Sequence, residues 1–363
     1  MDRFSCAGCG AELAWSPGKR ALACDSCGAA RPVEAPAQFV AEEHALERGL
    51  PPPLPDAPPA AGGLGLKTKL QVCKGCAAEM EVPPGSKTGR CPFCGSQYVM
   101  EQVSTRECEA PESVLPLAID LRKARELFTE WVGKGFFTPR ALRKERYLEG
   151  LQGFYIPAWT FDAAAASSWT AERGHYYYTT ESYRDSQGRT QTRQVRHTRW
   201  EYASGSRRDA YDDLMIPAAR DDIQEFLEQA GAFNTKAGLL PYRPEYLAGW
   251  NALRYTLDRA GGWNRAQQKM EATQEARCGD DVGGDTHRNL QVQTDFSAVK
   301  YKHTLLPYWI SSYKFRTKTY RFVINGETGA VAGEKPISWL KVALVVILAL
   351  GAIAVIALLV KDR

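Results

Sequence analysis

Phe154–Trp169, with the sequence FYIPAWTFDAAAASSW, begins a long stretch rich in aromatic, β-branched and small residues. Such residues favour extended strands. A polar stretch follows whose Gly188 suggests a hairpin turn, and strand-like sequence resumes at Thr198 as TRWEYASGS. Outward from this stretch, residues 152–337 are predicted to form a mixed α+β domain that is mostly antiparallel β.

A helical insertion is predicted inside this domain, over residues 220–231, 244–260 and 263–277. Strands are expected again at 289–296 and from 300 to 336, with a turn at Asn325-Gly326. The two strand-rich parts share a signature 150 residues apart, Ile156-Pro157-x-Trp159 and Leu306-Pro307-x-Trp309. This weak similarity suggests paired strands built around equivalent Pro and Trp positions.

Upstream of the β-rich domain, residues 113–151 are predicted to be a helical connector. Five apolar residues recur there at three- and four-residue spacing, which is typical of one buried helix face: Leu121, Ala124, Leu127, Phe128 and Trp131. Thr138 and Pro139 are expected to be the N-cap and first position of a second helix over 140–150.

Eight of the ten cysteines form four C-x-x-C pairs near the N-terminus. They occur as two units of two pairs, and each cysteine of the second unit lies 67 positions after its counterpart in the first: Cys6, Cys9, Cys24 and Cys27, then Cys73, Cys76, Cys91 and Cys94. Two C-x-x-C turns joined by a hairpin form a tetrahedral thiolate cage. The spacing therefore predicts two structural Zn²⁺ ions, in a zinc ribbon over residues 1–33 and a duplicate over 67–104.

A closed cage of four thiolates leaves no position for a substrate, so both metals are expected to fold their modules without taking part in catalysis. Residues 34–66 between the ribbons contain PPPLPDAPPAAGGLG, which predicts a Pro/Gly-rich linker. The two ribbons are therefore expected to move partly independently.

Val342–Val360 is a run of Val, Ala, Leu, Ile and Gly, flanked by Trp339 and Lys341 and by Lys361 and Arg363. Its length and flanks predict a transmembrane helix over residues 339–360. The basic excess between Lys300 and Lys341 predicts that the large N-terminal region faces the cytoplasm. The expected localisation is a cell membrane, with one span.

A formal net charge of +4 is too small to indicate nucleic-acid binding by itself. The five histidines are scattered along the chain and match no metalloprotease spacing. Asp280, Asp281 and Asp285 could hold a cation or could lie in a solvated loop, and Cys108 and Cys278 are expected to be spare thiols. No catalytic residue is predicted, so the chain is not expected to be an enzyme.

The strings FYIPAWTFDA, PEYLAGW and KHTLLPYWISSYKF, together with a C-x-x-C ribbon and an apolar C-terminus, resemble a family of bacterial membrane proteins. Its members are described as TFIIB-type zinc ribbon-containing proteins. The resemblance implies a non-enzymatic adaptor that works beside a phage-shock-protein-A-like protein and an SPFH/band-7-like protein. The duplicated ribbon departs from the single ribbon associated with this family, so neither ribbon inherits a family role.

Three functions remain open from the sequence. The first is a membrane-anchored zinc-ribbon adaptor that recruits cytosolic proteins, as in a phage-shock-like membrane stress system. The second is a regulator that binds nucleic acid through the ribbons, although these contain few Lys and Arg residues. The third is an enzyme whose pocket includes the polar aromatic cluster His175, Tyr176, Tyr177 and Tyr178.

Overall fold

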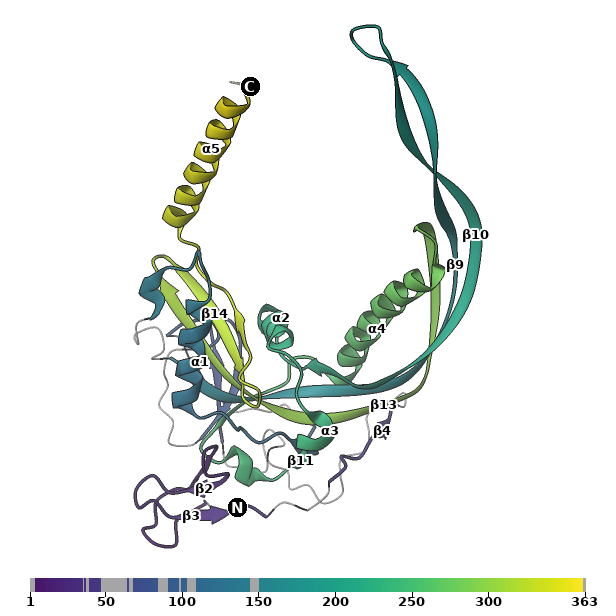
Figure 1. Cartoon of the computed structure of the whole chain (residues 1–363). Coiled ribbons are helices and arrows are strands. Elements are labelled where there is room, and N and C mark those ends of the chain that lie inside the picture. Colours follow the sequence, from purple (N-terminus) through teal and green to yellow (C-terminus); the bar gives the residue numbers. More distant parts are fainter. Residues whose placement is uncertain are drawn as a thin grey trace.

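Two long antiparallel strands, β9 (Gln152–Arg184) and β13 (Thr286–Phe315), run through the centre of the molecule. The computed structural model describes residues 4–34, 36, 39–46, 64, 68–83, 91–97, 99–102, 109–143 and 150–361. Figure 1 shows a body of strands and short helices, from which a long arm of β9, β13 and β10 (Thr190–Pro217) curves away. Strand is the main secondary structure, as the sequence predicted.

The remaining strands are mostly short. They are β1 (Ala14–Ser16), β2 (Ala21–Ala23), β3 (Ala30–Pro32), β4 (His44–Ala45), β5 (Lys69–Cys73), β6 (Glu79–Val82), β7 (Val99–Gln102), β8 (Ser113–Val114), β11 (Leu240–Pro241), β12 (Asn251–Leu253), β14 (Lys318–Asn325) and β15 (Val331–Gly333). The helices are α1 (Leu121–Gly133), α2 (Asp221–Gln229), α3 (Thr235–Gly238), α4 (Arg259–Val282) and α5 (Trp339–Lys361), with 3₁₀ turns η1 (Arg140–Arg143) and η3 (Pro244–Leu247).

β1, β2 and β3 form a small sheet of their own, and the other strands form a large sheet. The path through the large sheet runs β11-β8-β13-β9-β12-β6-β5-β7, with β10 paired to β9 and β14 paired to β13. The pairs β9–β13 and β9–β10 are antiparallel, whereas β12 lies parallel to β9. The second ribbon's strands β5, β6 and β7 are thereby part of the same sheet as the body.

The two Pro-Trp signatures lie opposite each other in the β9–β13 pair, where Leu306 faces Ile156. Each signature makes equivalent contacts. The carbonyls of Pro157 and Pro307 accept hydrogen bonds from the next loop, at 2.7 and 2.8 Å. The indoles of Trp159 and Trp309 donate to loop carbonyls at 2.9 and 2.8 Å. The expectation of paired strands around equivalent Pro and Trp positions is confirmed.

Three β-bulges shape the arm, and all of them lie on the strands that flank β9. Each coincides with a non-glycine residue at positive φ: Asp213 on β10, and Asn289 and Ala298 on β13. A bulge inserts an extra residue on one strand and so bends and twists the sheet locally. The bulges therefore account for the curvature of the arm in Figure 1. β9 itself keeps a regular alternation of buried and exposed residues from Ala163 to Trp169.

α4 packs on the concave side of the arm (Figure 1). Odd-numbered residues of β9 face it, since Trp169 and Ala171 are buried in one cluster with Cys278 of α4. Polar contacts reinforce the packing: Gln274 accepts a hydrogen bond from Ser167 at 2.9 Å. Arg207 of β10 forms an ion pair with Asp281 at 2.7 Å. The helix therefore supports the lower part of the arm.

Several predicted helices differ from the structure. Residues 244–260 contain η3 and β12 in place of most of the predicted helix, because Pro244 opens a 3₁₀ turn and Gly249 takes a positive φ of 80°. The second connector helix, predicted over 140–150, is a 3₁₀ turn at Arg140–Arg143, and residues 144–149 lie outside the described residues. α1 buries Ala124, Phe128 and Val132, whereas Leu121 is 37% exposed.

The transmembrane helix predicted over residues 339–360 is not supported. Within the part of the chain that the structure describes, no helix combines the length and the apolar composition needed to cross a membrane. The predicted single-pass membrane localisation is corrected accordingly.

Candidate metal centres

The four C-x-x-C turns share one backbone geometry. In each, the N–H of the first cysteine donates to the carbonyl five residues later, and its own carbonyl accepts from the N–H four residues later, at 2.6 to 3.0 Å. The residue four positions after the first cysteine has positive φ in every turn: Gly10 (72°), Gly28 (76°), Ala77 (55°) and Gly95 (75°). The turn thus needs a left-handed residue immediately after the second cysteine.

Each set of four thiols converges, so that the Sγ atoms within a set all lie within 4.8 Å of one another. The shortest Sγ–Sγ distances are 3.5 Å for Cys6–Cys27 and Cys9–Cys24, 3.6 Å for Cys73–Cys94 and 3.7 Å for Cys76–Cys91. Four sulfurs placed tetrahedrally at 2.3 Å from zinc are separated by about 3.8 Å. Both predicted cysteine sets are therefore assembled, and each could hold a zinc ion.

Backbone donors and thiol neighbours favour the thiolate at Cys6 and Cys24 of one cage and at Cys76 of the other, because they lower the pKa of these thiols. The pKa values of the remaining shifted thiols are raised, at Cys9, Cys27, Cys91 and Cys94. The N–H of Cys27 hydrogen-bonds to the sulfur of Cys24 and lowers the pKa of that thiol to about 6. The neighbouring thiol of Cys91 lowers the pKa of Cys76 to about 5. Since a metal binds the thiolate and not the thiol, these contacts prepare the cages for a cation.

Ribbon 1, residues 4–33, lies on the outside of the body. Trp15 attaches it: the indole donates to the carbonyl of Leu117 at 3.1 Å and packs edge-on to Tyr246 at 5.0 Å. Its backbone carbonyl accepts from the indole of Trp250 at 2.8 Å. Both cysteine turns are exposed at their tips, and so is β3. Ribbon 1 therefore presents its metal-binding end to solvent.

Ribbon 2, the described residues 68–83, 91–97 and 99–102, is built into the body. Cys73 and Cys91 are fully buried, and Phe93 packs on Phe154 of β9 with ring centroids 5.3 Å apart. β6 pairs with β12, and a buried ion pair between Glu81 and Arg254 links these two strands. The two ribbons share a sequence pattern and a cage geometry, but the cysteines and Phe93 of ribbon 2 lie in the largest core cluster, whereas ribbon 1 contributes Trp15 to a second cluster.

One acidic cluster was not predicted from the sequence: Asp162, Asp212 and Asp213. The cluster could not be recognised in the sequence because Asp162 is about 50 residues from the other two aspartates. Pairing of β9 with β10 brings the three together. Lysines neutralise the cluster, since Lys302 lies 2.6 Å from Asp213 and Lys236 forms an ion pair with Asp212. Because the ammonium groups already supply the positive charge, the cluster is explained as an ion-pair network.

The predicted Asp280, Asp281 and Asp285 do not converge. Asp281 forms the ion pair with Arg207, and Asp285 accepts a hydrogen bond from the N–H of Tyr176 at 2.8 Å. Cys278 is buried against the arm, where burial raises the pKa of its thiol. Cys108 lies outside the described residues.

The histidines also lie apart. His44 pairs with Glu112 at 2.8 Å, His175 contacts Glu201 at 3.2 Å, and His197 stacks on Tyr177. His287 is exposed at the start of β13. His303 is buried against Trp159, and burial lowers the pKa of its imidazole to about 4. Tyr176, Tyr177 and Tyr178 alternate between the two faces of β9 in the arm.

The chain is similar to the protein described as "Uncharacterized protein YdjG" of Bacillus subtilis (strain 168), with 28% identity over 242 residues. The match covers 64% of this chain and 66% of that protein, which is slightly less than two thirds of its length. No family model matches the chain. No solved structure matches it either.

Proposed function

We propose that the chain is a non-enzymatic adaptor in which ribbon 1 binds a protein partner and ribbon 2 is a structural part of the body. The different burial of two equivalent cages supports this division most directly. The first cysteines of all four turns are buried, but Cys9 and Cys27 of ribbon 1 are exposed, whereas their counterparts Cys76 and Cys94 in ribbon 2 are half-buried. In each cage a tetrahedral Zn²⁺ would be held by all four thiolates, with no open position for a reacting ligand.

The exposed surface of ribbon 1 is suited to contact a protein. β3 pairs only with β2 among the described strands, so its outer edge can accept another extended chain. Arg31 lies on this strand, and its guanidinium is 6.0 Å from the ring centroid of Phe4. Arginine beside an aromatic ring is a frequent combination at protein interfaces. A phage-shock-protein-A-like protein and an SPFH/band-7-like protein are the partners to test first.

The test measures binding of each purified candidate partner to the zinc-loaded full-length chain. Arg31→Glu on ribbon 1 should weaken binding by roughly tenfold or more, because interface arginines frequently contribute above 1 kcal/mol. Lys74→Glu is the matched control, since it makes the same charge change at an exposed position of ribbon 2. If both variants bind as the wild type does, or if Lys74→Glu alone weakens binding, ribbon 1 is not the recruiting surface.

Nucleic acid is the alternative ligand for ribbon 1. One of its few cations, Lys19, donates a hydrogen bond to the carbonyl of Gly28 within the same ribbon, at 3.2 Å. A salt titration of binding to short duplex and single-stranded DNA distinguishes a protein partner from a nucleic-acid ligand. Affinity that falls steeply with salt and depends on Arg31 would support the alternative over the adaptor.

A further inference from the structure

The end of the arm is a two-stranded hairpin with the composition of a protein interface. β13 begins opposite Gly174, so residues 175–184 of β9 pair only with residues 190–199 of β10 in the part of the chain that the structure describes. Four tyrosines and five arginines occur between residues 175 and 199, against two acidic residues and no lysine. Interfaces are enriched in Tyr and Arg and depleted in Lys, whereas solvated surfaces are not.

This hairpin lacks the support that the lower arm receives from α4 and β13. An isolated two-stranded hairpin is marginally stable in water. Tyr177 and Tyr178 are nevertheless 50% and 61% exposed. Arg199 has no acidic partner among the described residues. Arg193 is 3.2 Å from Glu181, and its guanidinium lies 5.7 Å from the ring centroid of Tyr183. Arg193 and Arg199 lie on the face of the arm that bears α4, because they pair with odd-numbered residues of β9. The hairpin therefore presents net positive charge and aromatic surface.

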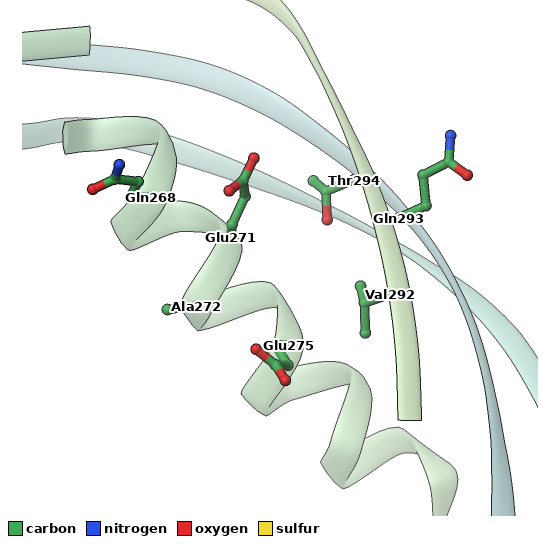
Figure 2. Close-up of a pocket in the computed structure, with 7 residues that line it drawn as sticks. All are labelled: Gln268, Glu271, Ala272, Glu275, Val292, Gln293 and Thr294. Atoms are coloured by element: carbon green, nitrogen blue, oxygen red, sulfur yellow. The ribbon is translucent and has the colours of Figure 1, made fainter. Parts of the chain in front are cut away.

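A groove with the opposite charge lies lower on the same arm. It has a volume of about 660 Å³ and runs between α4 and β13, where Glu271 and Glu275 face Val292 and Thr294 (Figure 2). The nearby α4 cations are already neutralised, Lys269 by Glu228 and Arg277 by Asp209. Within the described structure neither groove glutamate is paired with a cation, so the groove is negative.

The groove also borders an open sheet edge. In the described structure, residues 286–298 of β13 pair with β9 on one side and with no strand on the other. Such an edge offers backbone donors and acceptors to an added strand. If this edge paired with the same edge of another copy, the glutamates of the two grooves would lie close together. Repulsion between these carboxylates disfavours such a pairing. A positively charged strand is the complementary occupant.

We propose that a second copy of this chain supplies that occupant: the arms of two copies lie antiparallel, and the hairpin of each docks in the α4–β13 groove of the other. About 60 Å of strand separates the groove from the hairpin turn, at 3.3 Å per residue from Ser167 to Asp185. A two-fold axis reverses one arm relative to the other, so both hairpins reach both grooves at once. The assembly is therefore a closed dimer.

Charge reversal on each side of the contact tests the dimer by sedimentation equilibrium of the full-length chain. The groove variant Glu271→Arg/Glu275→Arg and the hairpin variant Arg193→Glu/Arg199→Glu should each weaken self-association by about tenfold or more, because like charges then face each other. An equimolar mixture of the two variants should recover wild-type association, since both contacts are then complementary. Glu126→Arg/Glu130→Arg on α1 is the control, with the same charge change on another helix, and should associate normally.

A photo-crosslinker at Val195, which lies on the same face as Arg193 and Arg199 because it pairs with Thr179, provides a second readout that needs no charge reversal. With equal amounts of ¹⁴N and ¹⁵N chains, crosslinks should join chains of different isotope content and map to residues 268–275. A monomeric wild type at about 50 µM would overturn the proposal, given that functional interfaces of this kind hold at micromolar concentration. Failure of the mixed variants to associate, or crosslinks confined to single chains, would also overturn it.

Discussion

The buried environment of His303 changes the pKa of its imidazole. Its ring stacks on Trp159 with centroids 4.5 Å apart, and its Nδ1 lies 3.2 Å from the carbonyl of Ala110. Nε2 has no hydrogen-bond partner within the described structure. Burial disfavours the charged imidazolium and lowers the pKa to about 4 from an ordinary value of 6.5. The folded chain therefore keeps this histidine neutral at pH values where the unfolded chain protonates it.

This difference predicts acid sensitivity. A depressed histidine pKa contributes stability that is fully present above pH 6.5 and is lost as the pH falls toward 4. The loss amounts to about 3 kcal/mol, at 1.36 kcal/mol for each unit of pKa difference. Urea unfolding at pH 7.5, 6, 5 and 4 should show a free energy of unfolding that falls less steeply in His303→Gln than in the wild type. The exposed His287→Gln should follow the wild type, and an unchanged slope in His303→Gln would refute the assignment.

Single residues also show what sequence reasoning can and cannot reach. The cysteine spacing was sufficient to predict both thiol sets, because local turns position them. The glycines after the second cysteines, Gly10, Gly28 and Gly95, have the positive φ expected of the turn. Ala77 takes the same conformation without being glycine, and Gly75 is needed instead for space, since an added Cβ would lie 3.0 Å from Ser96. Such contacts between two turns are not visible in a pattern.

At the scale of elements, the junction between β6 and β12 joins ribbon 2 to the body. Glu81 of β6 and Arg254, which directly follows β12, are 3% and 2% exposed and form an ion pair at this junction. The N–H of Arg254 also donates to the carbonyl of Glu79 at 3.0 Å. A buried ion pair adds little net stability over an apolar pair, but removal of one partner leaves an uncompensated charge in the core.

A double-mutant cycle should show this asymmetry. Glu81→Ala is expected to lower the free energy of unfolding by about 3–5 kcal/mol, because the buried Arg254 then loses its ion pair with Glu81. Glu81→Leu/Arg254→Leu removes both charges and should cost less than the single variant. Chemical denaturation followed by tryptophan fluorescence measures both. A double variant as unstable as Glu81→Ala would show that packing, and not charge, holds the junction.

Predictions of elements succeeded where local signals dominate. The hairpin turn at Gly188 is an example. The pairing of the two Pro-Trp signatures is not local, and it was predicted from their similarity instead. The prediction for residues 244–260 was wrong because its apolar spacing fits a helix, whereas β12 is held as a strand by pairing with β6 and β9. The length of the arm could not be predicted from the sequence either. It depends on pairing between segments more than 100 residues apart, such as Gly174 with Thr286.

At the scale of the whole molecule, the sequence predicted two equivalent and loosely tethered ribbons, and the structure makes them unequal. The linker composition gave no sign that ribbon 2 enters the large sheet, because β6 completes that sheet only through the distant β12. The apolar C-terminal run likewise predicted a membrane span that the described structure does not support. Tertiary context therefore places two copies of one pattern in different environments.

The final prediction follows from this inequality. Cys6→Ser/Cys24→Ser should lower the zinc content from two ions to one while the free energy of unfolding of the body changes by less than about 0.5 kcal/mol, because ribbon 1 attaches mainly through Trp15. Cys73→Ser/Cys91→Ser should remove one zinc as well, but should destabilise the body by about 3 kcal/mol or more, since metal binding there also stabilises the packing of Phe93 on Phe154.

Metal analysis of the purified variants and hydrogen exchange at β9 and β13 measure the two effects together. In the ribbon 2 variant, exchange should accelerate along the buried segment that contacts Phe93, whereas in the ribbon 1 variant it should accelerate only within residues 4–33. Because the variants remove equivalent cysteines from matched cages, any difference between them reflects where each cage lies in the fold. Equal destabilisation of the body by both variants would contradict the division into a recruiting ribbon and a structural ribbon.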